Sequence, residues 1–233
     1  MNVVITGGSR GLGKAMAEKF AAEGYNIYLA ARSEILLYNV LEKLMNANPD
    51  LVIKAKSFDL SVKAEAIAFA SWIRGFNVPI DILINNVGTF LPGSVFNEAD
   101  GQLEKMIETN LYPAYHITRE LLPDMIAKKS GHIFNICSIA SLQAYKNGGS
   151  YSISKFALSG FSRNLREELK PFGIKVTGVY PGAAYTDSWA HSGVDEARFM
   201  EPEDIARIIF DASKLSARAC VEDIILRPQL GDL

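Results

Sequence analysis

The chain has 233 residues, 48% of them hydrophobic, and a formal net charge of −2 at pH 7. This length suits one domain with a single core, the hydrophobic content excludes a disordered chain, and the charge balance excludes the basic surface of a typical nucleic-acid-binding protein.

No basic leader precedes the first apolar run, and no run is long enough to span a bilayer. The two cysteines, Cys137 and Cys220, have no disulfide or zinc spacing and lie in apolar, strand-like runs, which predicts reduced, buried thiols. His116, His132 and His191 have no metal-ligand spacing either. We therefore expect a cytoplasmic protein without a metal site or a membrane partner.

The first residues predict a strand, a glycine-rich loop and a helix. Residues 2–6 are mostly β-branched, Thr6-Gly7-Gly8-Ser9-Arg10-Gly11-Leu12-Gly13 follows, and apolar residues then recur at helical spacing up to Gly24. Glycines let the backbone approach a pyrophosphate closely, and a helix N-terminus offers it free N–H groups. The segment therefore predicts a site for dinucleotide phosphates.

The second predicted strand, residues 27–32, bears on the choice of dinucleotide. Proteins that prefer NAD carry an acidic residue near the end of this strand, which binds the adenosine ribose. Here Ala31 and Arg32 occupy that place. Arg32 and Arg10 offer forked, charged hydrogen bonds to a 2′-phosphate, which predicts NADPH.

Further elements follow in alternation. We expect helices at residues 34–48 and 202–215, strands at 51–58, 80–84, 132–137, 174–180 and 219–226, and a helix-rich segment at 98–129 in which Pro113 and Pro123 mark kinks or boundaries. Asp59 or Ser61 is a candidate N-cap for a helix starting at Val62. The apolar strands predict an α/β fold with a sheet covered on both faces.

The segment Tyr151-Ser152-Ile153-Ser154-Lys155 begins a long helical pattern, so Tyr151 and Lys155 share one helix face. An ammonium beside a phenol lowers the phenol pKa from its usual value of about 10. Ser138, at the end of a predicted strand, would point into the same crevice and hold a carbonyl oxygen. The alternative is an ordinary i, i+4 pair on a solvated helix face.

These landmarks stand in a fixed order: the glycine loop, Asn85-Asn86-Val87-Gly88, Asn110, Ser138, Tyr151 with Lys155, and Pro181-Gly182-Ala183-Ala184-Tyr185-Thr186. From Asn2 to at least Thr186 the chain resembles the short-chain dehydrogenase/reductase family, whose glycine spacing is also Gly-x-x-x-Gly-x-Gly. The resemblance implies one NAD(P)-binding domain over residues 1–233, a Rossmann-type doubly wound fold with a seven-stranded parallel sheet and helices on both faces, and NADPH/NADP+ as cofactor.

The resemblance also assigns roles to residues. The implied catalytic residues are Asn110, Ser138, Tyr151 and Lys155. The implied cofactor-binding residues are Gly7, Ser9, Arg10, Gly11, Leu12, Gly13, Arg32, Asp59, Leu60, Asn86, Val87, Gly88, Tyr151, Lys155, Pro181, Gly182, Ala184 and Thr186. Among them, Asp59 would hold the adenine amino group, and Ala184 and Thr186 would meet the nicotinamide carboxamide. Val87 departs from the alanine that the family usually has.

The substrate is indicated by the segment 180–189 and the chain end, which look similar to bacterial members related to sepiapterin reductase. This implies an NADPH-dependent carbonyl reductase that acts on a pterin side-chain ketone, with Ser138, Tyr151, Trp189 and Asp232 as substrate residues. Residues 187–200 would form a lid. The alternatives for Trp189 and Asp232 are a lid anchor and a frayed tail.

Other functions share this machinery. A 3-oxoacyl thioester reductase and a broad ketone or aldehyde reductase would use the same residues, and a nucleotide-sensing binding protein without catalysis is an alternative of another class. The last strand, at a sheet edge, predicts a homodimer or homotetramer.

Overall fold

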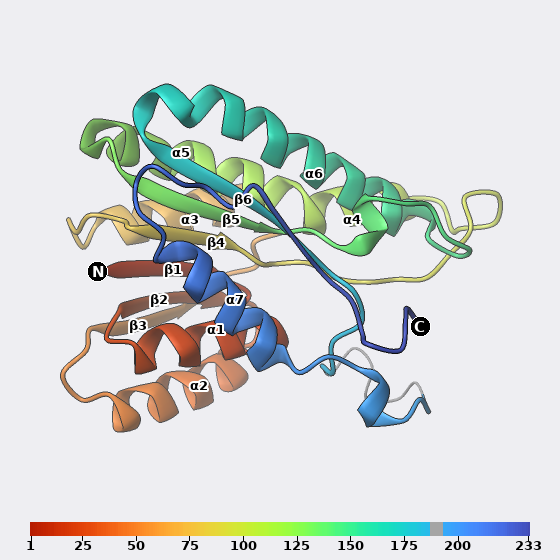
Figure 1. The fold of residues 1–233 in the computed structure, drawn as a ribbon, viewed down its shortest axis with the longest axis horizontal. Coiled ribbons are helices and arrows are strands. Elements are labelled where there is room, and N and C mark those ends of the chain that lie inside the picture. The colour runs from red at the N-terminus through yellow and green to blue at the C-terminus, as the bar shows by residue number, and fades with distance from the viewer. Residues whose placement is uncertain (187–192) are drawn as a thin grey trace.

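The computed structural model describes residues 1–186 and 193–233 and contains one seven-stranded parallel sheet with the strand order β3-β2-β1-β4-β5-β6-β7 (Figure 1). The strands are β1 (Asn2–Thr6), β2 (Asn26–Ala31), β3 (Ile53–Ser57), β4 (Ile82–Asn85), β5 (Gly131–Ile136), β6 (Ile174–Pro181) and β7 (Asp223–Leu226). All the pairings between them are parallel. The predicted doubly wound α/β sheet is confirmed.

Helices cover both faces of the sheet (Figure 1). Helices α1 (Gly11–Ala22), α2 (Glu34–Ala47) and α7 (Pro202–Ser213) lie on one face. Helices α3 (Lys63–Arg74), α4 (Gln102–Asn110), α5 (Tyr112–Lys128) and α6 (Gly149–Leu169) lie on the other. Short 3-10 turns occur at η1 (Ile139–Ser141), η2 (Lys170–Phe172) and η3 (Glu196–Arg198).

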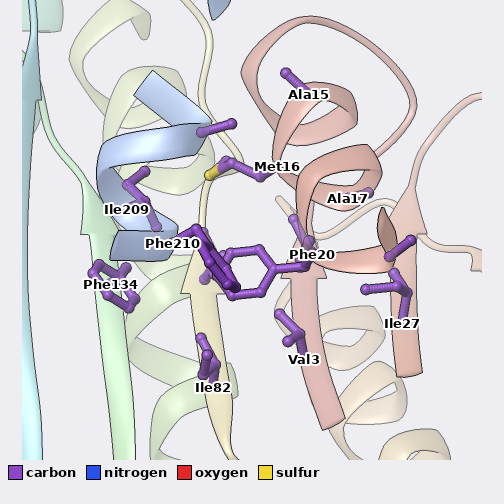
Figure 2. Close-up of a cluster of buried hydrophobic side chains, with 14 of the residues drawn as sticks. Val3, Ala15, Met16, Ala17, Phe20, Ile27, Ile82, Phe134, Ile209 and Phe210 are labelled. Atoms are coloured by element: carbon purple, nitrogen blue, oxygen red, sulfur yellow. The ribbon is translucent and has the colours of Figure 1, made fainter. Parts of the chain in front are cut away.

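The five inner strands, β1, β2, β4, β5 and β6, supply side chains to both cores because successive residues point to opposite faces. Val3 and Ile5 of β1 belong to the core under α1, α2 and α7, whereas Val4 between them belongs to the opposite core. In the first core, Phe20 and Phe210 meet edge to face, with ring centres 5.5 Å apart (Figure 2). The two-sided burial explains why the strands read as continuous apolar runs.

The strand order reverses between β1 and β4, which lie side by side at the centre of the sheet. The helices that follow them, α1 and α4, lie on opposite faces of the sheet (Figure 1). In open parallel sheets a crevice forms at this reversal, outside the carboxyl ends of the strands.

The helix-rich segment 98–129 is two helices. Helix α4 ends at Asn110, and α5 begins at Tyr112 with Pro113 in its first turn, where a missing N–H costs no helical bond. Pro123 lies inside α5, so it does not mark a helix boundary.

The last strand is shorter than expected, and this changes the predicted environment of one cysteine. β7 begins at Asp223, so Cys220 lies before the strand and is exposed, whereas Cys137 is buried as predicted. Before β7, the Glu222 carbonyl still accepts the Gly178 amide at 2.9 Å, whereas the Val221 carbonyl accepts the Thr177 hydroxyl at 2.6 Å. The prediction of a buried thiol at Cys220 is therefore wrong.

His132 is a buried structural residue whose titration should be visible in stability. Its Nε2 lies 2.7 Å from the Thr177 hydroxyl, and its ring stacks on Phe134. Burial, with a smaller effect of Lys175, lowers its pKa from 6.5 to about 3. Below pH 6.5 the unfolded chain takes up a proton that the folded chain does not, so stability is lost as the pH falls toward 3.

We expect this histidine to cost about 2 kcal/mol of unfolding free energy between pH 7.5 and pH 5. His132→Phe should therefore show a flatter decline than the natural protein when urea unfolding is measured at both pH values. An equal decline in the two proteins would assign the acid sensitivity to other groups.

Candidate active site and cofactor pocket

A pocket of about 800 Å³ lies at the carboxyl ends of the strands. Its walls come from the segments that follow β1, β2, β3, β4, β5 and β6, together with the end of the chain. The lining includes the following residues with a predicted cofactor role: Gly7, Ser9, Arg10, Gly11, Leu12, Arg32, Asp59, Leu60, Asn86, Val87, Gly88, Tyr151, Lys155, Pro181, Gly182, Ala184 and Thr186. The predicted substrate residues Ser138 and Asp232 also line it.

The exception is Gly13, which packs the loop against the helix instead. A Cβ at this position would lie 2.1 Å from the Gly7 carbonyl oxygen and 2.6 Å from Asn86 Nδ2. Gly7 itself has φ of 72°, a conformation that favours glycine. Asn86 Nδ2 donates to the carbonyls of Thr6 and Gly7 at 2.9 and 3.1 Å. The loops after β1 and β4 are thus held together at the strand-order reversal.

Gly13→Ala should be strongly destabilising because the atom it meets is backbone and cannot move aside. We expect a loss of about 3 kcal/mol in the free energy of unfolding, measured by urea denaturation. Gly160→Ala is the matched control, since its Cβ would meet nothing within 4 Å, and it should be neutral or add up to about 1 kcal/mol. Equal stability of the two variants would contradict the close packing at Gly13.

The end of β2, where the adenosine of the cofactor is expected to bind, has no acidic residue. Ala31, Arg32 and Ser33 line the wall there, and Arg32 is exposed. The Ser57 hydroxyl donates to the Arg32 carbonyl at 2.9 Å, which fixes the backbone at this position. The Arg32 side chain remains exposed to solvent. The placement of Arg32 beside the pocket agrees with the expected recognition of a 2′-phosphate.

Asp59, which follows β3, also lines the pocket. Its carboxylate accepts hydrogen bonds from the Ser61 amide at 3.2 Å and from the Ser61 hydroxyl at 2.6 Å. Helix α3 begins at Lys63 with Val62 in the N-cap position. The prediction that Asp59 or Ser61 caps this helix is therefore wrong. Asp59 and Ser61 instead bond to each other in the turn after β3, and the helix begins one residue later than expected.

Asn110 is buried at the junction of α4 and α5. Its Oδ1 accepts from the Thr89 amide at 2.7 Å, and its Nδ2 donates to the Thr89 carbonyl at 3.1 Å and to the Ser154 hydroxyl at 2.9 Å. Asn110 therefore ties the segment after β4 to the helix that carries Tyr151, and it does not itself line the pocket.

Ser138, Tyr151 and Lys155 come together at the other end of the pocket. The Ser138 and Tyr151 side chains are hydrogen-bonded, and the Ala140 amide donates to Ser138 Oγ at 3.1 Å. Lys155 Nζ donates to the Ile136 carbonyl at 2.9 Å. A Cβ on Gly88 would lie 3.2 Å from this Nζ, so the absence of a side chain there leaves room for the ammonium.

The acid–base properties of this group differ from expectation. Burial raises the pKa of Tyr151 above 10, and the hydrogen bond to Ser138 offsets part of the rise. Lys155 does not lower it: its Nζ lies 6.0 Å from the Tyr151 ring centre, and burial lowers the pKa of the Lys155 ammonium to about 8. The prediction that Lys155 lowers the phenol pKa is therefore wrong: burial of the phenol has the largest effect on this pKa, and it raises it.

Two aromatic residues that the sequence analysis missed stand beside Tyr151. The Phe90 ring meets the Tyr151 ring edge to face at 4.8 Å, and both Phe90 and Tyr145 line the pocket. Burial and the nearby Tyr151 phenol raise the pKa of Tyr145 to about 12. Their only sequence signal is an aromatic residue in the loops after β4 and β5, and a single aromatic residue in a loop does not predict where its ring lies.

The C-terminal tail closes one side of the pocket. Asp232 forms an ion pair with Arg227, and both pack near Gly182, which donates its amide to the Leu226 carbonyl at 2.8 Å. The expected partner of Asp232 was the substrate, whereas its carboxylate is paired within the chain. Trp189 and His191 lie outside the described residues. The same holds for residues 187–192, the first part of the predicted lid at 187–200.

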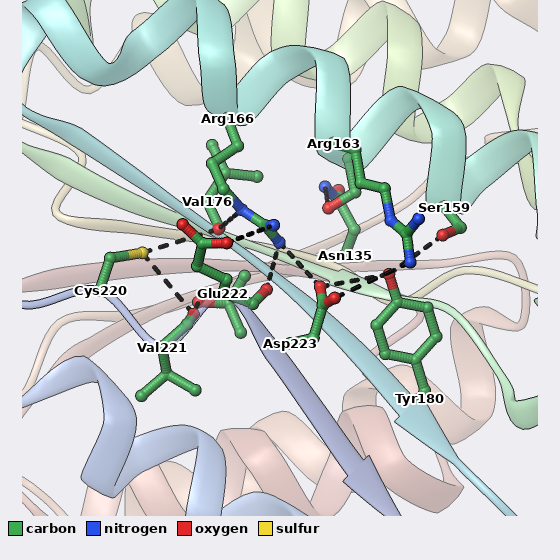
Figure 3. A network of polar contacts seen from close by, with 12 residues as sticks. Asn135, Ser159, Arg163, Arg166, Val176, Tyr180, Cys220, Val221, Glu222 and Asp223 are labelled. Atoms are coloured by element: carbon green, nitrogen blue, oxygen red, sulfur yellow. Dashed lines mark hydrogen bonds and ion pairs between the residues drawn. The ribbon is translucent and has the colours of Figure 1, made fainter. Parts of the chain in front are cut away.

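A polar network joins helix α6 to β6 and to the start of β7 (Figure 3). The buried guanidinium of Arg166 on α6 donates to the Val176 carbonyl at 3.0 Å and to the Asp223 carboxylate at 2.8 Å, and it pairs with Glu222 at 3.3 Å. The Tyr180 hydroxyl also donates to Asp223, at 3.3 Å. The network joins α6, β6 and β7, so the helix that carries Tyr151 and the strand that leads to Asp232 are held together.

Within residues 1–186 and 193–233, no helix combines the length and apolar character needed to cross a membrane. The same part of the chain has no group of three or more His, Cys, Asp or Glu residues placed to hold a metal ion.

Comparisons with known proteins agree with this geometry. Residues 1–197 match the family described as short chain dehydrogenase. An uncharacterized oxidoreductase of Staphylococcus saprophyticus is 30% identical over 226 residues, which cover 97% of this chain and 96% of that protein.

Two solved structures are similar over nearly the whole chain. A metagenomic short-chain oxidoreductase in complex with NADP is 29% identical, with a TM-score of 0.85 and coverage of 98% of this chain and 97% of its own. L-Sorbose reductase from Gluconobacter frateurii, complexed with NADPH and L-sorbose, is 27% identical, with a TM-score of 0.89 and coverage of 97% and 95%.

Proposed function

The chain belongs to the short-chain dehydrogenase family, and we propose that it is an NADPH-dependent oxidoreductase that reduces a carbonyl group to an alcohol. One observation carries this proposal: a single pocket has Arg10 and Arg32 on its wall and also contains Ser138, Tyr151 and Lys155. This arrangement suits a phosphorylated dinucleotide that reaches from the arginines to a proton donor.

The residues fit the cofactor at several points. Gly7 and Gly11 have φ of 72° and 51°, so the loop backbone can turn tightly beneath a pyrophosphate at the start of α1. Arg10 and Arg32 would hold the 2′-phosphate, and Asp59 the adenine amino group. Lys155 would hold the nicotinamide ribose, and Thr186 the carboxamide. Bound NADPH supplies the hydride.

The protein's own residues would complete the reaction at the carbonyl oxygen. Ser138 and Tyr151 would donate hydrogen bonds to that oxygen, and Tyr151 would then give up its proton. The raised pKa of Tyr151 keeps the phenol protonated at neutral pH, as a proton donor requires. Asn110 holds Ser154, one helical turn from Tyr151, through a hydrogen bond of 2.9 Å to its hydroxyl.

For the substrate, we propose a sepiapterin-like pterin with a side-chain ketone. Flat aromatic walls at Phe90 and Tyr145 beside Tyr151 support a planar substrate, and Asp232 supplies a carboxylate to the same pocket. Because Asp232 is paired with Arg227, a guanidine-like pterin edge would bind by sharing or replacing that arginine.

The test compares NADPH oxidation with sepiapterin and with an acetoacetyl thioester. We expect sepiapterin to be reduced, and Asp232→Ala to raise its KM by about 10-fold or more because a charged hydrogen bond is lost. Leu230→Ala, at an exposed position of the same tail, should leave KM unchanged. Reduction of the thioester but not of sepiapterin would retain carbonyl reduction and refute the pterin substrate.

We further propose that residues 1–233 act as one NAD(P)-binding domain in the cytoplasm, with a lid at 187–200, and that the protein is a homodimer or homotetramer. The outer edge of β7 supports self-association, since β7 pairs only with β6 among the described strands, and Ile225 on it is 56% exposed. Light scattering on the purified protein would give the assembled mass.

A further inference from the structure

Two loops meet at the start of the helix that carries Tyr151. One is residues 86–101, between β4 and α4, and the other is residues 142–148, between η1 and α6; they run beside each other away from the sheet (Figure 1). The Gly93 amide donates to the Asn147 carbonyl at 3.1 Å, and the Ser94 hydroxyl donates to the Asn147 side chain at 3.0 Å. Hydrogen bonds therefore connect the two loops.

Glu98 makes the strongest connection between the first loop and α6. Its Oε1 accepts the Ser150 amide at 2.8 Å, and its Oε2 accepts the Ser150 hydroxyl. Ser150 is 2% exposed and directly precedes Tyr151 in the first turn of α6. Gly148, at the N-cap of this helix, has no side chain to cap it, so the carboxylate of Glu98 binds a free N–H group at the positive end of the helix.

The backbone on both sides leaves room for this carboxylate. Gly149 has φ of 36°, and a Cβ there would lie 1.9 Å from Glu98 Oε1. A Cβ on Gly93 would lie 2.7 Å from Glu98 Cγ. Two glycines are thus required where the loop and the helix approach each other, so the contact depends on more than the two polar side chains.

The same loop reaches the other side of Tyr151. Phe90, near the start of the loop, has its ring edge to face with the Tyr151 ring at 4.8 Å. The loop therefore contacts Tyr151 through Phe90 and contacts the preceding residue of α6 through Glu98.

We propose that Glu98 is a positioning residue for Tyr151: by binding Ser150 it fixes the first turn of α6 and holds the loop that places Phe90 against the phenol. This role rests on the proposed function, in which Tyr151 is the proton donor. A small displacement of a proton donor can cost up to about 100-fold in rate, so the contact should affect turnover more than cofactor binding.

The test uses Glu98→Ala, Glu98→Gln and the control Asp100→Asn, which removes an exposed charge from the same loop. We expect Glu98→Ala to lower kcat by about 10- to 100-fold, with the Kd for NADPH within about twofold of the natural protein. The primary isotope effect with 4-deuterated NADPH should rise as the chemical step becomes slower. Glu98→Gln should restore most of kcat, because its amide can accept from the Ser150 N–H and donate to the Ser150 hydroxyl.

A contact that only stabilises the fold would lower the melting temperature without changing kcat per folded molecule or the isotope effect. Glu98→Ala with the kcat and isotope effect of Asp100→Asn would therefore overturn the proposal. Should Glu98→Ala fail to fold, Ser150→Ala removes one of the two bonds. We expect it to lower kcat by about 3- to 10-fold, and an unchanged kcat there would also overturn the proposal.

These outcomes are distinct from failure of the proposed function. If the natural protein has no turnover that depends on Tyr151, carbonyl reduction by this site is refuted. If that turnover exists and Glu98→Ala leaves it unchanged, only the positioning role is refuted.

Discussion

Tyr151→Phe is expected to lower kcat by about 10²- to 10⁴-fold, the range typical of a lost general acid. The variant keeps the ring that Phe90 contacts at 4.8 Å and removes only the hydroxyl that is hydrogen-bonded with Ser138. Since Lys155 is held by the Ile136 carbonyl and not by the phenol, the ammonium should stay in place. The Kd for NADPH should therefore change by no more than about threefold.

The measurement is steady-state kinetics with a carbonyl substrate, together with fluorescence titration of NADPH. Tyr38→Phe is the control, because Tyr38 is an exposed tyrosine on α2, away from the pocket lining. Natural kcat in Tyr151→Phe would exclude Tyr151 as the proton donor. A large loss of NADPH affinity in the variant would instead assign Tyr151 mainly to cofactor binding.

Arg32→Asp is expected to shift the ratio of kcat/KM for NADPH over NADH by about 10²-fold toward NADH. The change removes a charged hydrogen bond worth roughly 1.5–3 kcal/mol and adds a carboxylate that repels the 2′-phosphate and accepts from a ribose hydroxyl. Because Arg32 is exposed at the end of β2, the fold should tolerate the change.

Arg218→Asp makes the same change in charge at an exposed position outside the pocket lining, and it should leave the ratio unchanged. An unchanged ratio in Arg32→Asp, or equal efficiency of NADH and NADPH with the natural protein, would remove Arg32 from the cofactor site.

The sheet was predictable because its inner strands are buried on both faces and so form short apolar runs, as in residues 2–6 and 174–180. The pocket residues were predictable because they directly follow those strands, so finding a strand also places the loop after it. The start of β7 was not predictable, because Ala219, Cys220 and Val221 have a strand-like composition, whereas the structure binds the Val221 carbonyl through the Thr177 side chain.

Properties that depend on distant residues could not be read from the sequence. The pKa of Tyr151 depends on how deeply the phenol is buried, and a pair of residues four apart on a helix carries no information on that. Glu98 and Ser150 are 52 positions apart, and their contact depends on Gly93 and Gly149 as well. Such contacts between loops require the folded structure.

Transfer of deuterium from 4-deuterated NADPH to the product tests carbonyl reduction most directly. Sepiapterin, an acetoacetyl thioester and simple ketones or aldehydes would each be offered, with products analysed by mass spectrometry. We predict deuterium on the new carbinol carbon of at least one product, formed by the natural protein and at least about 100-fold more slowly by Tyr151→Phe. No deuterated alcohol from any of these carbonyls, or equal formation by both proteins, would contradict the assignment of this pocket as a carbonyl-reducing site with Tyr151 as its proton donor.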